Sequence, residues 1–406
     1  MSVASVAQSE TIVRPAKPRA LLFTAFEPSG DEHASAVIAE LKARDPSLPI
    51  FAWGGPKMAA AGATIVERTG QSAVMGVPGM AKIVEHTQIN ARIRAWLEQN
   101  RTGPTPVVAH IPVDSPAANG PICKIAKSQG LLVIHLVAPQ IWAWGRWRIH
   151  KLRRITDMVL CMLPFEEEFF RKRNVPCAFV GHFLFDKPLD FSALDMRASG
   201  FGDGHPRIAL MPGSRPAELA LHFPILLDTF RRVLEVFPAA QGVVAATTPA
   251  VGEHLRKVGE AHPRGWPETL RIVTNDTDAA VRWCETAIVK SGTVTLQVAK
   301  QHKPMVVFYK KKGLLSRLLM RIFVSTKYFS LPNVLAHARI VPELVPHYGD
   351  HKAVTAAVLH LLQNPQEAQQ QRDALGEITA RFRGLHAAGN AADHIQRIAQ
   401  LAVPSA

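Results

Sequence analysis

Residues 20–44, ALLFTAFEPSGDEHASAVIAELKAR, contain the pattern that decides the fold. The segment 20–25 is apolar at almost every position, which predicts a strand covered on both faces. A turn follows in which Ser29 and Asp31 are residue types that favour a helix start. Residues 32–44 then predict an amphipathic helix. This strand, turn and helix form the unit from which parallel sheets are built.

The same unit recurs along the chain of 406 residues. Apolar strand patterns alternate with helical patterns in both halves, so we predict an α/β protein of two Rossmann-like, doubly wound domains. The further predicted strands are Ile50–Trp53, Val107–Ile111, Leu131–Val137, Met158–Met162, Ile208–Met211, Gly242–Ala246, Leu270–Val273, Thr286–Val289 and Met305–Phe308.

Composition divides the chain into five predicted segments. Residues 1–19 have no apolar run and predict a flexible tail rather than a signal peptide. The first domain is predicted at 20–185, a polar linker at 186–206, the second domain at 207–362 and C-terminal helices at 363–406. Ligands of such sheets bind beyond the carboxyl ends of the strands, so we expect the site in strand-end loops facing a cleft between the domains.

Charge and cysteine content limit the classes of function. The chain has 47 Lys and Arg against 33 Asp and Glu, a net charge of +14 that predicts an acidic partner. A membrane surface or a phosphorylated ligand is favoured over nucleic acid, because no nucleic-acid fold motif is present. Four cysteines without a CxxC pair indicate neither a disulfide framework nor a cysteine zinc site, and favour the cytoplasm.

One loop of the second half is typical of a phosphate site. Met211-Pro-Gly-Ser-Arg215 joins a strand to a helix. Free N–H groups at a helix start, together with Ser214 and Arg215, suit an anion. A structural turn is the alternative. The chain has neither a GxGxxG motif nor a GxxxxGK[ST] motif, so no dinucleotide cofactor or P-loop is expected.

A second loop has the same position in its own strand–helix unit. Ser291, Gly292 and Thr293 can offer hydroxyl and N–H groups to a phosphate or a ribose, and Gln297 lies one turn further along the helix. The alternative is an ordinary capped helix. Asp276-Thr-Asp278 resembles a metal–diphosphate motif but opens a predicted helix, where Asp is a common cap, so we expect no metal.

Acidic residues follow two strands of the first half. Glu27 and Asp31 can accept hydrogen bonds from a ligand, or can belong to a plain capped turn. Asp114 follows the strand at 107–111 and is either a general base at the edge of the cleft or a turn former.

Two further segments combine cations with apolar side chains. Trp144 and Arg148 suit a sugar face and a phosphate, a nucleic-acid surface, or a packed aromatic corner. Residues 310–323, KKKGLLSRLLMRIF, predict a cationic amphipathic helix for anionic lipid, with a core-packed helix as the alternative. The cations expected at the membrane are Lys310, Lys311, Lys312, Arg317 and Arg321.

These loops together resemble the lipid-A-disaccharide synthase family, glycosyltransferases of the GT-B fold, over residues 20–362. The residues that carry the resemblance are Glu27 with Ser29-Gly-Asp31, Gly54-Gly-Pro56 with Met58, Val74-Met-Gly76, Asp114 with Pro116 and Asn119, Pro139 with Trp142-Ala-Trp144, Arg148 and Lys151, Leu163-Pro-Phe-Glu166, Gly181-His182, Pro212-Gly-Ser-Arg215, Ser291-Gly-Thr293 with Thr295-Leu296, Pro304-Met-Val-Val307, and Ser330-Leu-Pro-Asn333.

The resemblance implies a specific reaction. The family joins UDP-2,3-diacylglucosamine to 2,3-diacylglucosamine 1-phosphate (lipid X), with inversion, without metal or cofactor, at the cytoplasmic membrane face. Asp114 falls on the catalytic base, and Arg215 and Ser291-Gly-Thr293 fall on the UDP-binding segments. Asn333 falls on an active-site asparagine.

Several positions depart from the family pattern. Phe26 stands for Gly, Pro28 for Ala, Gly79 for Glu, Ala117 for Asp, Gly145 for Arg and Gln297 for Glu. The departures leave two alternatives to the family reaction. One is a divergent paralogue with another acceptor or nucleotide sugar, and the other is a non-catalytic protein that binds lipid or nucleotide sugar.

Overall fold

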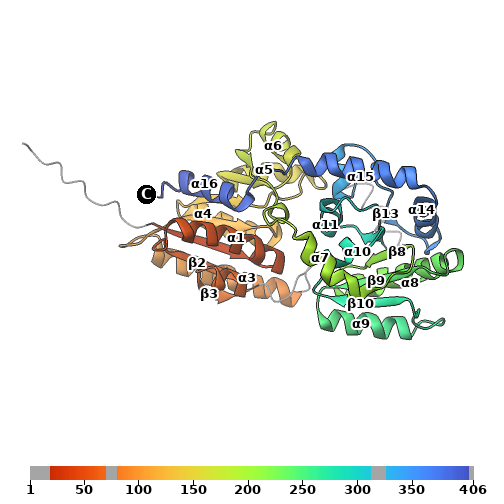
Figure 1. The fold of residues 1–406 in the computed structure, drawn as a ribbon. Coiled ribbons are helices and arrows are strands. Elements are labelled where there is room, and N and C mark those ends of the chain that lie inside the picture. Colours follow the sequence, from red (N-terminus) through yellow and green to blue (C-terminus); the bar gives the residue numbers. More distant parts are fainter. Residues whose placement is uncertain (1–18, 70–79, 312–325, 402–406) are drawn as a thin grey trace, which may run out of the picture. The chain divides into compact units, whose positions relative to one another are not determined.

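The computed structural model describes residues 19–69, 80–311 and 326–401 (Figure 1). It has two parallel sheets with helices between their strands, which confirms the predicted α/β class. One sheet has the strand order β3-β2-β1-β4-β5-β6-β7, and the other has the order β10-β9-β8-β11-β12-β13.

The first sheet is built from the N-terminal part of the chain. Its strands are β1 (Ala20–Ala25), β2 (Ile50–Gly54), β3 (Thr64–Arg68), β4 (Val107–Val113), β5 (Leu132–Leu136), β6 (Met158–Cys161) and β7 (Cys177–Phe179). The helices between them are α1 (Pro28–Arg44), α2 (Pro56–Ala60), α3 (Met80–Asn100), α4 (Pro116–Ser128), α5 (Ile149–Ile155) and α6 (Pro164–Arg171).

The second sheet repeats this architecture with different sequences. Its strands are β8 (Arg207–Met211), β9 (Gln241–Ala246), β10 (Leu270–Thr274), β11 (Thr286–Lys290), β12 (Met305–Lys310) and β13 (Glu343–His347). The helices are α7 (Phe191–Ala198), α8 (Pro216–Val236), α9 (Pro249–Glu260), α10 (Thr277–Trp283), α11 (Val294–Lys300), α13 (Leu331–Ala336), α14 (Lys352–Gln363), α15 (Pro365–Ala380) and α16 (Ala387–Ile398).

By its internal packing the chain forms two compact units. One holds Met1–Leu136, Ile155–Met158 and Ala391–Ala406, and the other holds Val137–Arg154 and Val159–Asn390. The end of α16 belongs to the first unit, where Arg44 Nη1 donates to Asp393 Oδ1 at 2.5 Å and to Gln396 Oε1 at 2.8 Å. The sequence placed residues 363–406 in a separate helical segment, since nothing local marks this long-range contact.

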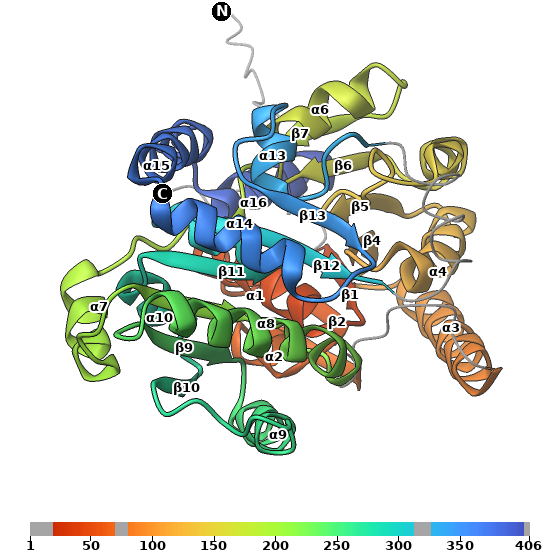
Figure 2. The same ribbon diagram turned by 90° about the vertical axis from the view of Figure 1, so that its right-hand side faces the viewer.

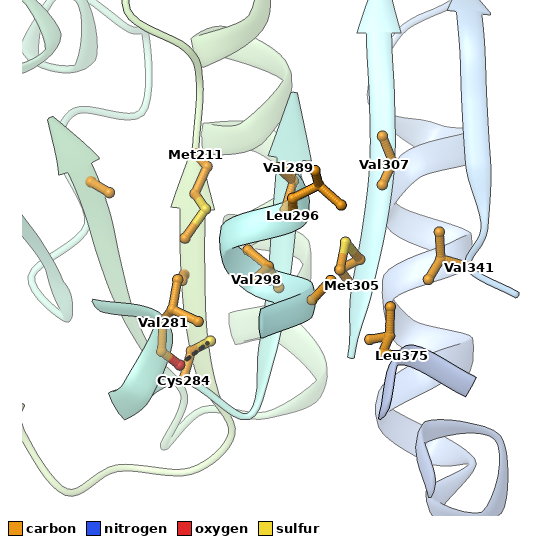
Figure 3. Close-up of a cluster of buried hydrophobic side chains, with 14 of the residues drawn as sticks. Met211, Val281, Cys284, Val289, Leu296, Val298, Met305, Val307, Val341 and Leu375 are labelled. Carbon is orange, nitrogen blue, oxygen red and sulfur yellow. Dashed lines mark hydrogen bonds between the residues drawn. The ribbon is translucent and has the colours of Figure 1, made fainter. Parts of the chain in front are cut away.

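The interior strands of the second sheet, β8, β9, β11 and β12, are buried on both faces. Ala209 and Met211 of β8 point into one core with α10, α11, α13 and α15, part of which Figure 3 shows. Ile208 and Leu210 point into the opposite core, with α8, α9 and α14. Figure 2 shows α8 and α14 together on this second face. This two-sided cover explains why strands of the sheet interior read as unbroken apolar runs.

The strands that the sequence analysis did not predict lie at sheet edges. Along β3 exposed and half-buried residues alternate, β7 has three residues, and β13 is mostly half-buried. Edge strands need no continuous apolar run, so the pattern used for the interior strands does not find them. The predicted linker at 186–206 contains α7, where Leu194 is buried and Asp195 pairs with Arg282 at 2.6 Å.

Within the described ranges, no helix is both long enough and apolar enough to span a bilayer.

Candidate functional site

Each sheet has one point at which the strand order reverses. In the first sheet the neighbours β1 and β4 flank this point, and in the second sheet β8 and β11 do. Ligands of open α/β sheets bind beyond the carboxyl ends of such strands. Four of the predicted loops follow these four strands: those at Glu27, Asp114, Arg215 and Ser291. The topology therefore brings the loops together in pairs, one pair in each unit.

In the first unit the Glu27 and Asp114 loops are neighbours. Parallel pairing sets Ala25 beside Val113, so both loops leave the sheet at the same level. Ser115 Oγ donates to Glu27 Oε1 at 3.2 Å. Glu27 and Asp114 are half-buried and Ser29 is exposed, so these three predicted residues lie at an accessible edge of the unit.

The backbone at Asp114 has an uncommon conformation. Asp114 and Ser115 have φ of 48° and 41°, and non-glycine residues seldom adopt this left-handed region. Asn119 holds the turn, because its Nδ2 donates to the carbonyl oxygens of Val113 at 3.1 Å and of Asp114 at 2.8 Å. Such strain at a strand end is typical of functional positions.

A buried hydrogen-bond chain supports Asn119 from behind. Thr24 Oγ1 donates to Asn119 Oδ1 at 2.6 Å and lies 2.8 Å from His110 Nε2. The Thr24 hydroxyl donates its only proton to Asn119, so Thr24 Oγ1 must accept a hydrogen bond from His110. His110 therefore carries its proton on Nε2. Burial lowers the pKa of His110 to about 3, which keeps the ring neutral. Asn119, predicted to bind substrate, is fully buried and therefore positions the Asp114 turn.

Asp31 also points inward. The residue is 5% exposed, and its carboxylate accepts backbone hydrogen bonds from Gly55 at 2.9 Å, Lys57 at 3.0 Å and Met58 at 3.1 Å. Asp31 thus caps the start of α2 from a distant part of the chain. A Cβ on Gly55 would lie 2.5 Å from Asp31 Oδ2, so only glycine leaves room for this contact. This cap explains Gly55 of the Gly54-Gly-Pro56 motif, whereas a Cβ on Gly54 would collide with the Met58 side chain.

In the second unit the Pro212-Gly-Ser-Arg215 turn precedes α8. Gly213 has φ of 106°, Ser214 is exposed and Arg215 is half-buried. Arg215 Nη1 lies 3.3 Å from Glu218 Oε1, in the first turn of the helix. A cation, an exposed hydroxyl and the start of a helix of 21 residues lie together here, which is the chemistry predicted for an anion site.

The neighbouring turn after β11 has Ser291 and Gly292 half-buried and Thr293 exposed. Gln297 Nε2 donates to Asp278 Oδ1 at 3.3 Å. The sequence places Gln297 one turn beyond the predicted phosphate or ribose contacts and does not indicate this link to α10. Asp276 accepts from the backbone N–H of Ala279 at 3.4 Å, which confirms it as a helix cap.

Trp144 and Arg148 form one surface feature. The Arg148 guanidinium lies 3.9 Å from the Trp144 ring centroid and donates to the Trp144 carbonyl at 3.0 Å. Trp144 is 49% exposed, so the alternative of a packed aromatic corner does not describe this ring. It describes Trp142 instead, whose buried Nε1 donates to Glu166 at 2.9 Å. Burial raises the pKa of Glu166 to about 7.

The remaining predicted residues lie elsewhere or outside the described ranges. Asn333 is fully buried, donates to the Val341 carbonyl at 2.9 Å and accepts from the N–H groups of Ile340 and Val341. Lys310 and Lys311 are half-buried at the end of β12. Lys312, Arg317, Arg321 and Gly79 lie outside the described residues. Among the side chains that are described, no group of three potential metal ligands was found.

We predict unequal stability effects for the two carboxylates at the start of α1. Asp31→Ala removes three charge-assisted hydrogen bonds, and it should lower the free energy of unfolding by about 2 to 3 kcal/mol. Glu27→Ala, the matched control, should change it by less than about 0.5 kcal/mol because Glu27 is half-buried at the edge. Urea unfolding measures both. Equal effects of the two changes would contradict the assigned cap.

Comparisons with known proteins show the family of the chain. The family model Lipid-A-disaccharide synthetase matches residues 21–393. The chain is 32% identical to lipid-A-disaccharide synthase of Solibacter usitatus, over 93% of this chain and 97% of that protein. It is 34% identical to lipid-A-disaccharide synthase of Paraburkholderia phymatum, over 86% of this chain and 89% of that protein.

Solved structures of glycosyltransferases share the fold. A UDP-glucosyltransferase from Polygonum tinctorium superposes with a TM-score of 0.62 at 10% identity, over 96% of this chain and 100% of that chain. The glycotransferase of kitacinnamycin superposes with a TM-score of 0.60 at 16% identity, over 95% and 100%. The fold is therefore GT-B, and the chain belongs to the lipid-A-disaccharide synthetase family of glycosyltransferases.

Proposed function

We propose that this protein joins UDP-2,3-diacylglucosamine to 2,3-diacylglucosamine 1-phosphate and releases UDP. The observation that supports the proposal is that each of the two sheets has a reversal point followed by a suitable charged side chain, in a chain that belongs to this family. A carboxylate, Asp114, follows β4 in one unit, and a cation, Arg215, follows β8 in the other. An inverting sugar transfer needs both groups, a base for the acceptor and positive charge for the leaving diphosphate.

The acceptor step falls to Asp114 in this proposal. Its carboxylate takes the proton of the acceptor 6-hydroxyl while the oxygen attacks the anomeric carbon from the face opposite UDP. The C–O bond to UDP breaks as the new bond forms, and its electron pair leaves on the diphosphate. The strained turn that Asn119 holds limits the positions open to the Asp114 side chain. A fixed base lowers the entropic part of the barrier.

The donor step falls to the loops of the second unit. Arg215, at the start of α8, faces the diphosphate in this proposal, and Ser214, Ser291, Gly292 and Thr293 supply further donors. These groups stabilise the charge that grows on the leaving UDP, so the proposal needs neither a metal nor another cofactor. Glu27, Ser29, Trp144 and Arg148 are assigned to sugar and phosphate contacts.

The direct test supplies purified protein with both acylated substrates. We expect UDP and the β-1,6-linked disaccharide 1-phosphate in equal amounts, measured by mass spectrometry. UDP release without the disaccharide would replace this reaction with transfer to another acceptor. Binding of UDP without release from the donor would instead indicate a non-catalytic protein.

Changes in the two loops should separate catalysis from donor binding. Asp114→Ala removes the base, so turnover should fall by at least about 100-fold while the Kd for UDP stays within about threefold. Arg215→Met removes a charge-assisted contact, so UDP should bind about 10- to 100-fold more weakly. Isothermal titration calorimetry and the disaccharide assay provide the two readouts.

Glu32→Ala is the matched control for the Asp114 change. Its side chain is 65% exposed, and its carboxylate pairs with Lys57 at 2.9 Å. Both readouts should stay near wild-type values. Turnover retained by Asp114→Ala would reject the assigned base, whatever the result for Arg215.

We also propose peripheral binding at the cytoplasmic face of the membrane. Both proposed substrates are acylated and anionic, and the chain carries a net charge of +14. Replacing Lys310, Lys311, Lys312, Arg317 and Arg321 by Gln should lower binding to phosphatidylglycerol vesicles by more than tenfold, because each cation near such a surface contributes about 1 kcal/mol.

Vesicle sedimentation in low salt measures this binding. The charge-matched control replaces five cations whose side chains are at least half exposed: Lys57, Lys172, Arg232, Lys257 and Lys352. The control should keep most of the binding. Equal losses in both variants would show that net charge, and not this segment, directs the protein to anionic lipid.

A further inference from the structure

Lys290, the last residue of β11, is a buried cation beside the proposed diphosphate site. Only 8% of the residue is exposed. Its Nζ lies 3.0 Å from Glu218 Oε1, and the Arg215 Nη1 lies 3.3 Å from the same oxygen. Two cations therefore share one carboxylate oxygen. Nothing in the local sequence pattern predicts a role for Lys290.

This group of three charges, which we call the Lys290 triad (Lys290, Glu218 and Arg215), lies against both proposed phosphate loops. A Cβ on Gly213 would lie 3.0 Å from Glu218 Oε2 and 3.4 Å from Lys290 Cδ. A Cβ on Gly292 would lie 3.6 Å from Lys290 Nζ. Lys290 thus fills the space between the loop after β8 and the loop after β11.

The surroundings of Lys290 favour an indirect role. The side chain is about nine-tenths buried, and its Nζ also lies 5.3 Å from the Tyr309 ring centroid. Burial lowers the pKa of Lys290, and Glu218 acts in the opposite direction by favouring the charged form. Glu218 is itself 7% exposed, and its Oε2 has no hydrogen-bond partner among the described residues.

An uncompensated Glu218 would oppose anion binding in two ways. The negative charge of Glu218 would repel a diphosphate at the loop after β8. Glu218 would also hold Arg215, which would then be the only cation of the triad that pairs with it. With Lys290 present, the triad carries a net charge of +1 by the sum of two cations and one carboxylate. Charges at such buried positions interact more strongly than charges in water.

We propose that Lys290 is a positioning residue of the diphosphate site, which neutralises Glu218 and so leaves Arg215 available to the anion. The inference rests on the proposed use of a UDP-sugar donor and assigns that donor site a residue beyond its loops. Lys290 acts through Glu218 and does not need to touch the ligand.

The experiment compares Lys290→Met, Glu218→Gln and the double variant, with UDP, uridine and inorganic pyrophosphate as ligands. Lys290→Met should weaken UDP and pyrophosphate about 10- to 100-fold and leave uridine within about twofold. Adding Glu218→Gln removes the charge that Lys290 compensates, so the double variant should regain UDP affinity to within about threefold of wild type. Calorimetry measures the anions, and ligand-observed NMR measures uridine.

A structural role would give a different pattern. Lost packing would weaken UDP and uridine alike, and Glu218→Gln would not restore binding. Either result would overturn the inference. Lys290→Arg keeps the charge and should bind UDP within about threefold of wild type.

Glu218→Gln alone keeps the test open if Lys290→Met does not fold. It should bind UDP at least as tightly as wild type, with a steeper dependence on salt, because the triad then carries a charge of +2. Weaker UDP binding in this folded variant would overturn the inference. If wild type binds pyrophosphate with these responses but not UDP, the donor proposal falls and the role of Lys290 stands. If the wild-type protein binds neither UDP nor pyrophosphate, the donor proposal and the role of Lys290 are both rejected.

Discussion

The covering of each parallel sheet by helices on both faces is the constraint on which the site depends. A right-handed crossover fixes the face on which a helix lies, so the direction of winding must reverse for both faces to be covered. In the second unit α8 follows β8 onto one face and α11 follows β11 onto the other. The two loops between them diverge over neighbouring strand ends, and the polar residues of the loops are left free of the cores.

Buried carboxylates serve structure and function in different ways in this protein. Asp31 has its charge met by three backbone N–H groups at the start of α2. Glu218 instead has its charge met by two cations and retains an oxygen without a hydrogen-bond partner among the described residues. Full satisfaction by the backbone is typical of a structural cap. The balance of charge among Lys290, Glu218 and Arg215 can change when an anion binds. A donor site requires such a change.

The structure shows where two of the departures from the family pattern, Ala117 and Gln297, lie. Ala117 is exposed in the first turn of α4, two residues beyond the strained turn at Asp114 and Ser115. Gln297 is linked to Asp278 of α10. Neither departure removes a group that holds Asp114 or Arg215.

The sequence by itself determined the α/β class, the interior strands and the four loops that follow the reversal strands. These features depend on local periodicity and turn residues, which neighbouring positions set. Only the tertiary structure decided which polar side chains of the loops are already occupied. Asp31, Asn119 and Asn333 are bound to backbone groups. In the sequence Lys290 is only the residue at the end of a strand. Its charge is paired with Glu218, 3.0 Å away, because β8 lies beside β11 in the sheet.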